Sequence, residues 1–146
     1  MKLILLTVLL VASFMLQAQE TIRNGSPEDI AAITQTLQDR YLAGWAASDS
    51  VKLRSAFYAP ADLRYINAEG KFTVWKLNDY IAGTKPGPAR AIQTHIYYID
   101  VVGNAAQAKL HIIYNGVRFT DFMNLLKVEG RWYIASKSFM REALKN

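Results

Sequence analysis

The stretch that decides the fold is residues 95–140, HIYYIDVVGNAAQAKLHIIYNGVRFTDFMNLLKVEGRWYIASKSFM. Three turn signals, Gly103-Asn104, Asn115-Gly116 and Glu129-Gly130, divide it into four runs rich in β-branched and aromatic residues. Such dipeptides between alternating hydrophobic runs are a strong short-range signal of a β-hairpin. The sequence from Ala91 onward therefore predicts four antiparallel strands joined by two-residue turns.

These turns also set the register of the predicted sheet. Alternation from each turn predicts that one face packs against helices, and this inner face holds His95, Tyr97, Ile99, Val101, Ala106, Ala108, Leu110, Ile112, Tyr114, Phe119, Asp121, Met123, Leu125, Trp132, Ile134, Ser136 and Ser138. The outer face is predicted to be polar, with His111 and Lys137, around an apolar patch of Ile96, Tyr98, Ile113, Phe122, Leu126, Tyr133 and Phe139. A β-bulge in either long strand would exchange the two faces beyond it.

Helices are predicted before the meander. Residues 26–48 carry an N-cap serine, Ser26, and a proline at the first helical position. An apolar stripe at spacings of three and four runs along this segment: Ile30, Ile33, Leu37, Tyr41, Gly44 and Trp45. A second short helix is expected to start at Ser48 or Asp49 and to end at Pro60. Strands over residues 63–67 and 71–75, a helix over residues 76–84 and a loop over residues 85–88 complete the segment.

The first residues have the layout of an export signal. Lys2 precedes an apolar run over residues 3–16, which is too short to span a bilayer, and Gln17-Ala18-Gln19 follows it. We expect cleavage near Ala18, a secreted or periplasmic protein, no membrane attachment after removal of residues 1–18, and one domain over residues 19–146. The alternative is that the run forms a buried first helix.

Composition narrows the function classes. The chain has no cysteine, which excludes a disulfide scaffold, a thiolate nucleophile and a Cys-ligated metal. Its net charge of +5 comes from basic residues scattered singly, so no nucleic-acid partner is expected. Two histidines, with His111 on the outer face, are too few for a metal site. We expect neither a metal nor a cofactor.

The order of helix, short helix, hairpin, helix and long meander resembles the cone-shaped α+β fold of the nuclear transport factor 2-like superfamily. Residues 41–45 (YLAGW), 103–106 (GNAA) and 119–132 (FTDFMNLLKVEGRW) carry the resemblance, which covers nearly all of residues 19–146. Together they look like the secreted bacterial branch called the putative lumazine-binding family. The resemblance implies three N-terminal helices packed on a curved antiparallel sheet of about six strands.

Ketosteroid isomerase, an enzyme of this superfamily, allows a comparison of single positions. There a tyrosine of the first helix and a protonated aspartate hold an oxyanion while another aspartate moves the proton. Residues 39–43 (DRYLA) resemble the segment with that tyrosine, so Tyr41 matches. Neither carboxylate is present, because the equivalent positions fall at Tyr65 or Ile66 and at Leu125 or Asn124.

Asp121 is the main candidate for chemistry. A carboxylate on the apolar face must be paired, hydrogen-bonded or protonated, and Ser138 lies opposite it in the predicted register. His95 is on the same face, with its Cα about 10 Å away, and is the one partner for a His–Asp pair of the scytalone dehydratase type. Alternatively, a bulge turns Asp121 outward, or its carboxylate satisfies a backbone group.

Inward aromatic residues favour a pocket for a flat ligand: Tyr41, Trp45, Tyr65, Trp75, Tyr80 and Tyr97. The main hypothesis is a secreted domain that binds a small hydrophobic or heteroaromatic ligand through Tyr41, Trp45, Tyr65, Tyr80, His95, Tyr97, Asp121 and Ser138. One alternative is a cofactor-free lyase, isomerase or cyclase that uses Asp121, His95 and Tyr41. Another is a purely structural dimerisation module. The apolar residues predicted on the outer face indicate a homodimer in any case.

Overall fold

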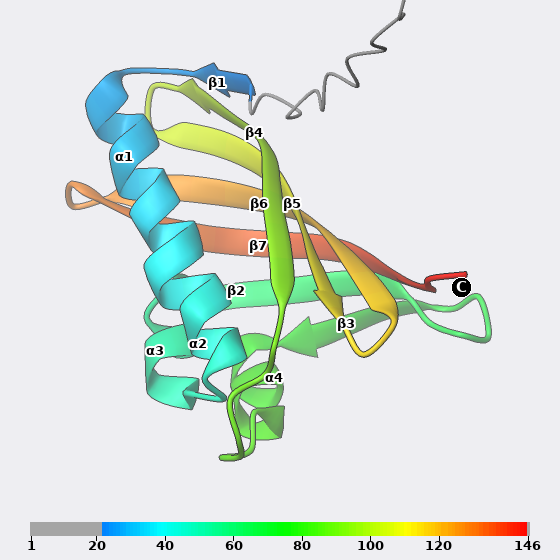
Figure 1. Cartoon of the computed structure of the whole chain (residues 1–146). Coiled ribbons are helices and arrows are strands. Elements are labelled where there is room, and N and C mark those ends of the chain that lie inside the picture. Colours follow the sequence, from blue (N-terminus) through cyan, green and yellow to red (C-terminus); the bar gives the residue numbers. More distant parts are fainter. Residues whose placement is uncertain (1–21, 146) are drawn as a thin grey trace, which may run out of the picture.

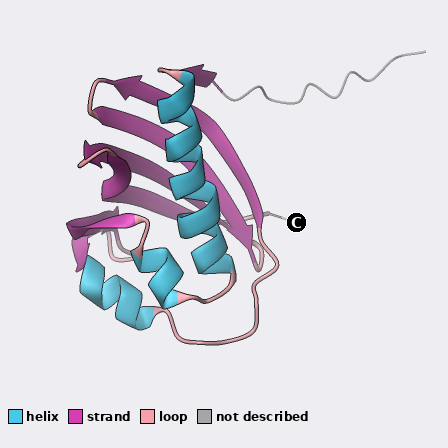
Figure 2. Ribbon diagram, turned by 90° about the vertical axis from the view of Figure 1, so that its left-hand side faces the viewer, coloured by secondary structure: helices cyan, strands magenta, loops and turns pink. Residues whose placement is uncertain are grey.

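A computed structural model describes residues 22–145, and the expected export signal, residues 1–18, lies outside the described residues. Seven strands form one curved mixed sheet, in the order β1-β4-β5-β6-β7-β2-β3. Helices cover one face of this sheet, and the other face is left open (Figures 1 and 2). The elements along the chain are β1 (Ile22–Asn24), α1 (Pro27–Gln35), η1 (Thr36–Leu42), α2 (Ala43–Ala46), α3 (Ser50–Arg54), β2 (Phe57–Ile66), β3 (Phe72–Lys76), α4 (Leu77–Gly83), β4 (Gln93–Val102), β5 (Ala105–Tyr114), β6 (Val117–Val128) and β7 (Arg131–Ala143).

The predicted meander and its three two-residue turns are confirmed. Val102 pairs with Ala105, Tyr114 with Val117, and Val128 with Arg131. Asn115 and Gly116 both have positive φ, 48° and 71°, which is the backbone that a tight turn of this kind requires. The three hairpins therefore start in the predicted register.

One long helix forms from α1, η1 and α2, and it lies diagonally across the sheet (Figure 2). Ser26 caps it by accepting a hydrogen bond from the Asp29 amide at 3.1 Å, as predicted. Its middle part, η1, is π-helical, and this turn carries Tyr41 with its side chain buried in the core. Gly44 allows α3 to approach, because a Cβ there would lie 2.6 Å from the Leu53 amide nitrogen.

Strand β2 is longer than predicted. It starts at Phe57, so Pro60 lies within the strand and does not end the second helix. The β2–β7 register shifts between Phe57 and Asp62, where a proline is tolerated because no ladder hydrogen bond is required of it. β2 pairs with β7 in parallel, as β1 does with β4, so the sheet is mixed and has seven strands.

A bulge in β4 corrects the predicted face of two site residues. The β4–β5 register shifts between Ile96 and Tyr98, so Ile96 pairs with Leu110 and is buried in the core. His95 pairs with His111, and the Tyr97 hydroxyl lies 2.6 Å from His111 Nδ1. His95 and Tyr97 therefore lie on the outer face, because the extra residue reverses the alternation on the N-terminal side of the bulge.

A second bulge, in β7, corrects four more predicted positions. The β6–β7 register shifts so that Asn124 pairs with Ser136 but Leu125 pairs with Ile134. Beyond this shift Ser136 and Ser138 lie opposite Asn124 and Phe122, on the outer face and not on the predicted inner face. Lys137 and Phe139 instead face inward, opposite Met123 and Asp121. Ser138 is thus not a partner of Asp121, and Lys137 takes its place.

Candidate functional site

A cavity of about 160 Å³ lies between the long helix, α4 and strands β2, β3, β5, β6 and β7. Its walls are mostly aromatic and its polar groups are few, as in most small-molecule sites. The lining residues are Tyr41, Trp45, Tyr65, Trp75, Tyr80, Ile112, Phe119, Asp121, Lys137, Phe139 and Arg141. Side chains from the helices, from β2–β3 and from the meander therefore meet around one space.

Three polar side chains form a closed triangle in the wall of this cavity. The Tyr41 hydroxyl donates a 2.6 Å hydrogen bond to Asp121 Oδ2, and Lys137 Nζ donates one of 2.9 Å to the Tyr41 oxygen. Lys137 Nζ also lies 3.2 Å from Asp121 Oδ1, which has no further polar partner among residues 22–145. Asp121 is 0% exposed and Lys137 5% exposed, so this triangle is almost completely desolvated.

Each member of the triangle comes from a different element. Tyr41 comes from the π-helical turn η1, and local π-helical turns are frequent at functional sites. Asp121 faces inward from β6 opposite Leu110, as the hairpin register predicts. Lys137 faces inward because the β7 bulge precedes it. The polar triangle thus depends on one predicted register and one β-bulge.

Aromatic rings surround the lysine head. Nζ lies 4.7 Å from the ring centroid of Phe139, 5.2 Å from that of Tyr41 and 5.4 Å from that of Tyr80. Burial lowers the pKa of Lys137, and the Asp121 carboxylate opposes part of this effect. Burial also raises the pKa of Tyr41 well above its usual value. Burial in this site therefore destabilises the charged form of the Lys137 amine.

A second, outer cavity of about 270 Å³ shares Trp45, Trp75 and Tyr80 with the first. The guanidinium carbon of Arg90 lies 4.5 Å from the centre of the Trp45 ring, and Arg90 also donates a hydrogen bond to the Trp45 carbonyl oxygen. The rings of Trp75 and Tyr80 are nearly parallel, at 19°, with their centroids 6.3 Å apart. The two cavities therefore adjoin each other along the aromatic rings of Trp45, Trp75 and Tyr80, which line both.

The structure brings together five of the eight side chains predicted to bind a ligand. Tyr41, Trp45, Tyr65, Tyr80 and Asp121 line the inner cavity, and their part in ligand binding stays a prediction. His95, Tyr97 and Ser138 lie on the outer face, so the predicted His95–Asp121 pair does not form. Lys137 and Arg141 were missed, because only the bulge in β7 turns them inward.

His95, Tyr97 and His111 form a cluster of rings on the outer face. The ring centroids of His95 and Tyr97 are 4.7 Å apart, and those of His95 and His111 are 5.8 Å apart.

No group of three or more metal-ligating His, Cys, Asp or Glu side chains occurs within residues 22–145. In the same part of the chain, no helix has the length and apolar character needed to cross a bilayer.

The buried tyrosines predict a loss of stability in alkali. Burial raises the pKa of Tyr41 and of Tyr80, so both stay protonated when folded but ionise near pH 10 when unfolded. The folded state then binds more protons, and stability falls above pH 10 by about 1.4 kcal/mol per pH unit for each tyrosine. Lys137, whose pKa is lowered, acts oppositely: stability rises towards its unfolded pKa of about 10.4.

Urea unfolding between pH 8 and 11 measures this dependence. Tyr80→Phe is expected to make the decline above pH 10 shallower, whereas Tyr58→Phe, at a partly exposed tyrosine on β2, is expected to leave it unchanged. Equal slopes for the wild type and Tyr80→Phe would contradict the prediction.

A curved sheet covered on one face by helices, with an aromatic cavity between the long helix and the meander, defines a nuclear transport factor 2-like domain. Three solved nuclear transport factor 2-like proteins of unknown function are similar to it. That from Shewanella baltica is 32% identical, with a TM-score of 0.73, over 82% of this chain and 98% of that one. Those from Methylobacillus flagellatus and Silicibacter pomeroyi are 27% and 26% identical, with TM-scores of 0.73 and 0.70, over 85% and 79% of this chain and 100% and 97% of theirs.

The sequence pattern of the family described as putative lumazine-binding matches residues 28–140. The chain belongs to this family, within the nuclear transport factor 2-like superfamily. A comparison with curated proteins finds no match.

Proposed function

We propose that the protein is an exported binding protein that holds a small planar ligand in the inner cavity. The observation that carries this proposal is the desolvated triangle of Tyr41, Asp121 and Lys137 in the wall of an otherwise aromatic cavity. Buried polar groups of this kind are costly unless they are satisfied. A ligand that hydrogen-bonds to them gains orientation as well as affinity.

The size and walls of the cavity favour a ligand with one or two rings. An engineered protein cavity of about 150 Å³ holds a benzene molecule, and the inner cavity has a volume of about 160 Å³. Stacked ring pairs, Trp75–Tyr80 and Tyr65–Phe139, provide flat surfaces along its wall. A larger or tailed ligand would extend into the outer cavity beside Arg90.

The polar triangle favours a ligand that both donates and accepts hydrogen bonds. Asp121 Oδ1 can accept a bond from a ring N–H, and Lys137 Nζ can donate one to a ring carbonyl. Lumazine, after which the family is named, is a flat heteroaromatic molecule with both kinds of group. It is therefore a suitable first probe.

Export is part of the proposal, since Lys2 and the apolar run over residues 3–16 have the layout of a secretory signal. Native mass spectrometry of the protein isolated from its own host tests export and ligand binding together. We expect a chain that begins near Gln19 and carries a small molecule that denaturation releases. An intact Met1 would contradict export, and a mass with no added ligand would argue against tight binding.

A titration with lumazine tests the cavity itself. Trp45 and Trp75 line it, so a bound ring is expected to quench tryptophan fluorescence. Ile112→Phe places a larger side chain in the cavity and is expected to abolish quenching, whereas Ile113→Phe, on the outer face of the same strand, is the matched control. Equal binding by the wild type and Ile112→Phe would place the ligand elsewhere, and no quenching by lumazine together with no retained ligand would overturn the proposal.

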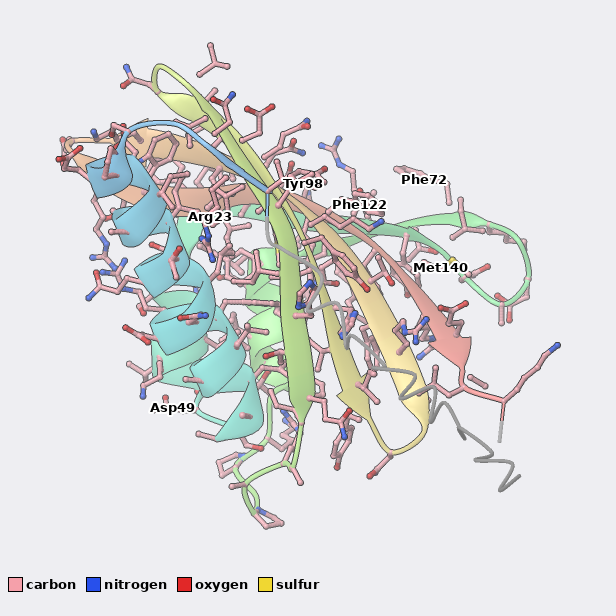
Figure 3. The ribbon with its side chains drawn as sticks, turned by 45° about the horizontal axis from the view of Figure 1, so that its top comes forward. Arg23, Asp49, Phe72, Tyr98, Phe122 and Met140 are labelled. Carbon is pink, nitrogen blue, oxygen red and sulfur yellow. The ribbon has the colours of Figure 1, made fainter. Side chains whose placement is uncertain are left out.

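We also propose that the protein is a homodimer that pairs through the outer face of the sheet. Among the exposed apolar side chains on this face, five on β2, β3, β6 and β7 form what we call the outer patch: Ile66, Phe72, Val74, Phe122 and Met140. Ile66 pairs with Phe72, and Phe122 lies diagonally across from Met140 on the neighbouring strand. Figure 3 shows Phe72, Phe122 and Met140 on the side of the sheet away from the long helix. A patch of this kind on a soluble domain favours a partner.

A further inference from the structure

We propose that Lys137 captures carbonyl compounds by forming a Schiff base with an aldehyde or ketone bound in the inner cavity. The inference rests on the proposed function, because the carbonyl compound has to enter the same cavity. It adds a chemical class of ligand and a covalent step at a named atom.

The geometry gives Lys137 the setting of a reactive amine. Its side chain is 6% exposed and lines the inner cavity. The amine therefore faces a bound molecule rather than bulk solvent. Three aromatic rings lie around Nζ, within 5.4 Å of their centroids. A lysine in an apolar pocket is activated as a nucleophile because desolvation favours its neutral form. The direction of its pKa, which burial lowers, agrees with this setting.

Asp121 accepts and later returns the proton that the reaction moves, and Tyr41 positions the two reacting groups. Asp121 Oδ1 lies 3.2 Å from Nζ, close enough to take a proton from the ammonium group and free its lone pair. The amine nitrogen then attacks the carbonyl carbon, and one proton passes from this nitrogen to the carbonyl oxygen to give a carbinolamine. Tyr41, whose hydroxyl contacts both groups, holds Asp121 and Lys137 in position.

The proton held by Asp121 next moves to the carbinolamine hydroxyl, which leaves as water while the nitrogen lone pair forms the C=N bond. The net change is one lysine ammonium plus one carbonyl compound giving one protonated imine plus one water molecule. Charge is conserved, and Asp121 ends as the carboxylate beside the positive iminium, as it began beside the ammonium. No oxidant, reductant or metal takes part.

The internal comparison for this proposal is Lys109. Its Nζ also lies over two aromatic rings, 5.1 Å from Tyr97 and 5.4 Å from Phe122, but on the outer face. No carboxylate of residues 22–145 forms an ion pair with it, and it lines neither the inner nor the outer cavity. Lys109 thus shares the aromatic surroundings of Lys137 without the cavity or the proton acceptor.

Reductive trapping with benzaldehyde and sodium cyanoborohydride tests the inference. Benzaldehyde has one ring, which suits the volume of the inner cavity, and reduction of its imine leaves a stable benzyl group on the lysine. Peptide mapping of the trapped protein is expected to show at least tenfold more benzyl label at Lys137 than at Lys109 at limiting aldehyde. Ile112→Phe keeps Lys137 but fills the cavity, so it is expected to abolish the preference. Lys137→Arg keeps the positive charge and is expected to remove the main adduct.

Benzyl alcohol, which has the same ring but no carbonyl carbon, separates this inference from the proposed function. If benzyl alcohol quenches tryptophan fluorescence while benzaldehyde labels Lys137 no faster than Lys109, the ligand cavity stands and the Schiff-base proposal is overturned. A preference for Lys137 that persists in Ile112→Phe also overturns it, because the reaction would not need the cavity. If neither probe binds and no ligand is retained, the proposed function fails, and the inference fails with it.

Discussion

Asp121→Asn is expected to lower the free energy of unfolding by about 3 to 5 kcal/mol, the usual range for breaking a buried ion pair. The amide keeps the shape of the side chain but leaves the Lys137 ammonium without its counter-ion, in a site where it is 5% exposed. A buried carboxylate without a charged partner would make Asp121→Asn neutral or stabilising, because desolvating an ionised carboxylate is costly. The Lys137 contact reverses that expectation. Thermal unfolding is expected to show a decrease in Tm of about 10 °C or more.

The double variant Asp121→Asn/Lys137→Met distinguishes this explanation from a simple packing defect. Methionine is apolar and fits the aromatic surroundings, so the double variant removes the stranded charge. It is expected to recover most of the stability that Asp121→Asn loses, because a buried ion pair gives little net stability over a well-packed apolar pair. Glu142→Gln, at the exposed Arg118–Glu142 ion pair, is the control and is expected to change stability by less than about 1 kcal/mol. Additive losses in the double variant would contradict the explanation.

The meander was predictable because its turns act locally. Asn115-Gly116 favours positive φ at both positions, and this backbone fixes Tyr114 opposite Val117 whatever else the chain does. From that turn the alternation on β5 and β6 continues without interruption, so Asp121 falls opposite Leu110 as predicted. The register of these two strands, and with it the inward position of Asp121, follows from the sequence.

The bulges were not predictable, because tertiary packing sets them. In β4 the extra residue is Tyr97, and the shift buries Ile96 against β5. In β7 the shift keeps Trp132 and Ile134 inward on one side of it and turns Lys137 inward on the other. Strict alternation of successive side chains along β7 would place Lys137 on the solvent side. For an unpaired lysine that position costs less free energy than burial. Only its proximity to Asp121 and Tyr41, far away in the sequence, makes the inward position possible.

The parallel edge strands were missed for a related reason. β1 has only three residues and all of them are exposed, so no periodic pattern marks it. In β2, Ala59 and Pro60 interrupt the strand signal, although the chain stays extended through the irregular pairing with β7. Short or interrupted strands form because a neighbouring strand offers hydrogen-bond partners, which the local sequence does not record.

The second large effect is expected at the outer patch. Phe122 is 43% exposed and Met140 is 61% exposed, and they lie diagonally on neighbouring strands at the middle of the open face. In a dimer with twofold symmetry the same patch is used by both protomers, so each substitution acts twice. Burial of such a side chain contributes about 1 kcal/mol or more, and four of them together correspond to about a thousandfold in the dissociation constant. Four lysine ammonium groups would add their own desolvation cost.

Phe122→Lys/Met140→Lys is therefore expected to turn a dimer into a monomer in sedimentation velocity at micromolar concentration, with an unchanged circular dichroism spectrum because neither side chain is part of the core. Val51→Lys is the matched control, since Val51 is 79% exposed on α3, on the helical side of the molecule, and its replacement is expected to leave the dimer intact. A monomeric wild type would disprove the dimer directly. A double variant that keeps twice the chain mass would show that the subunits meet elsewhere, because an interface centred on this patch would have to bury all four ammonium groups.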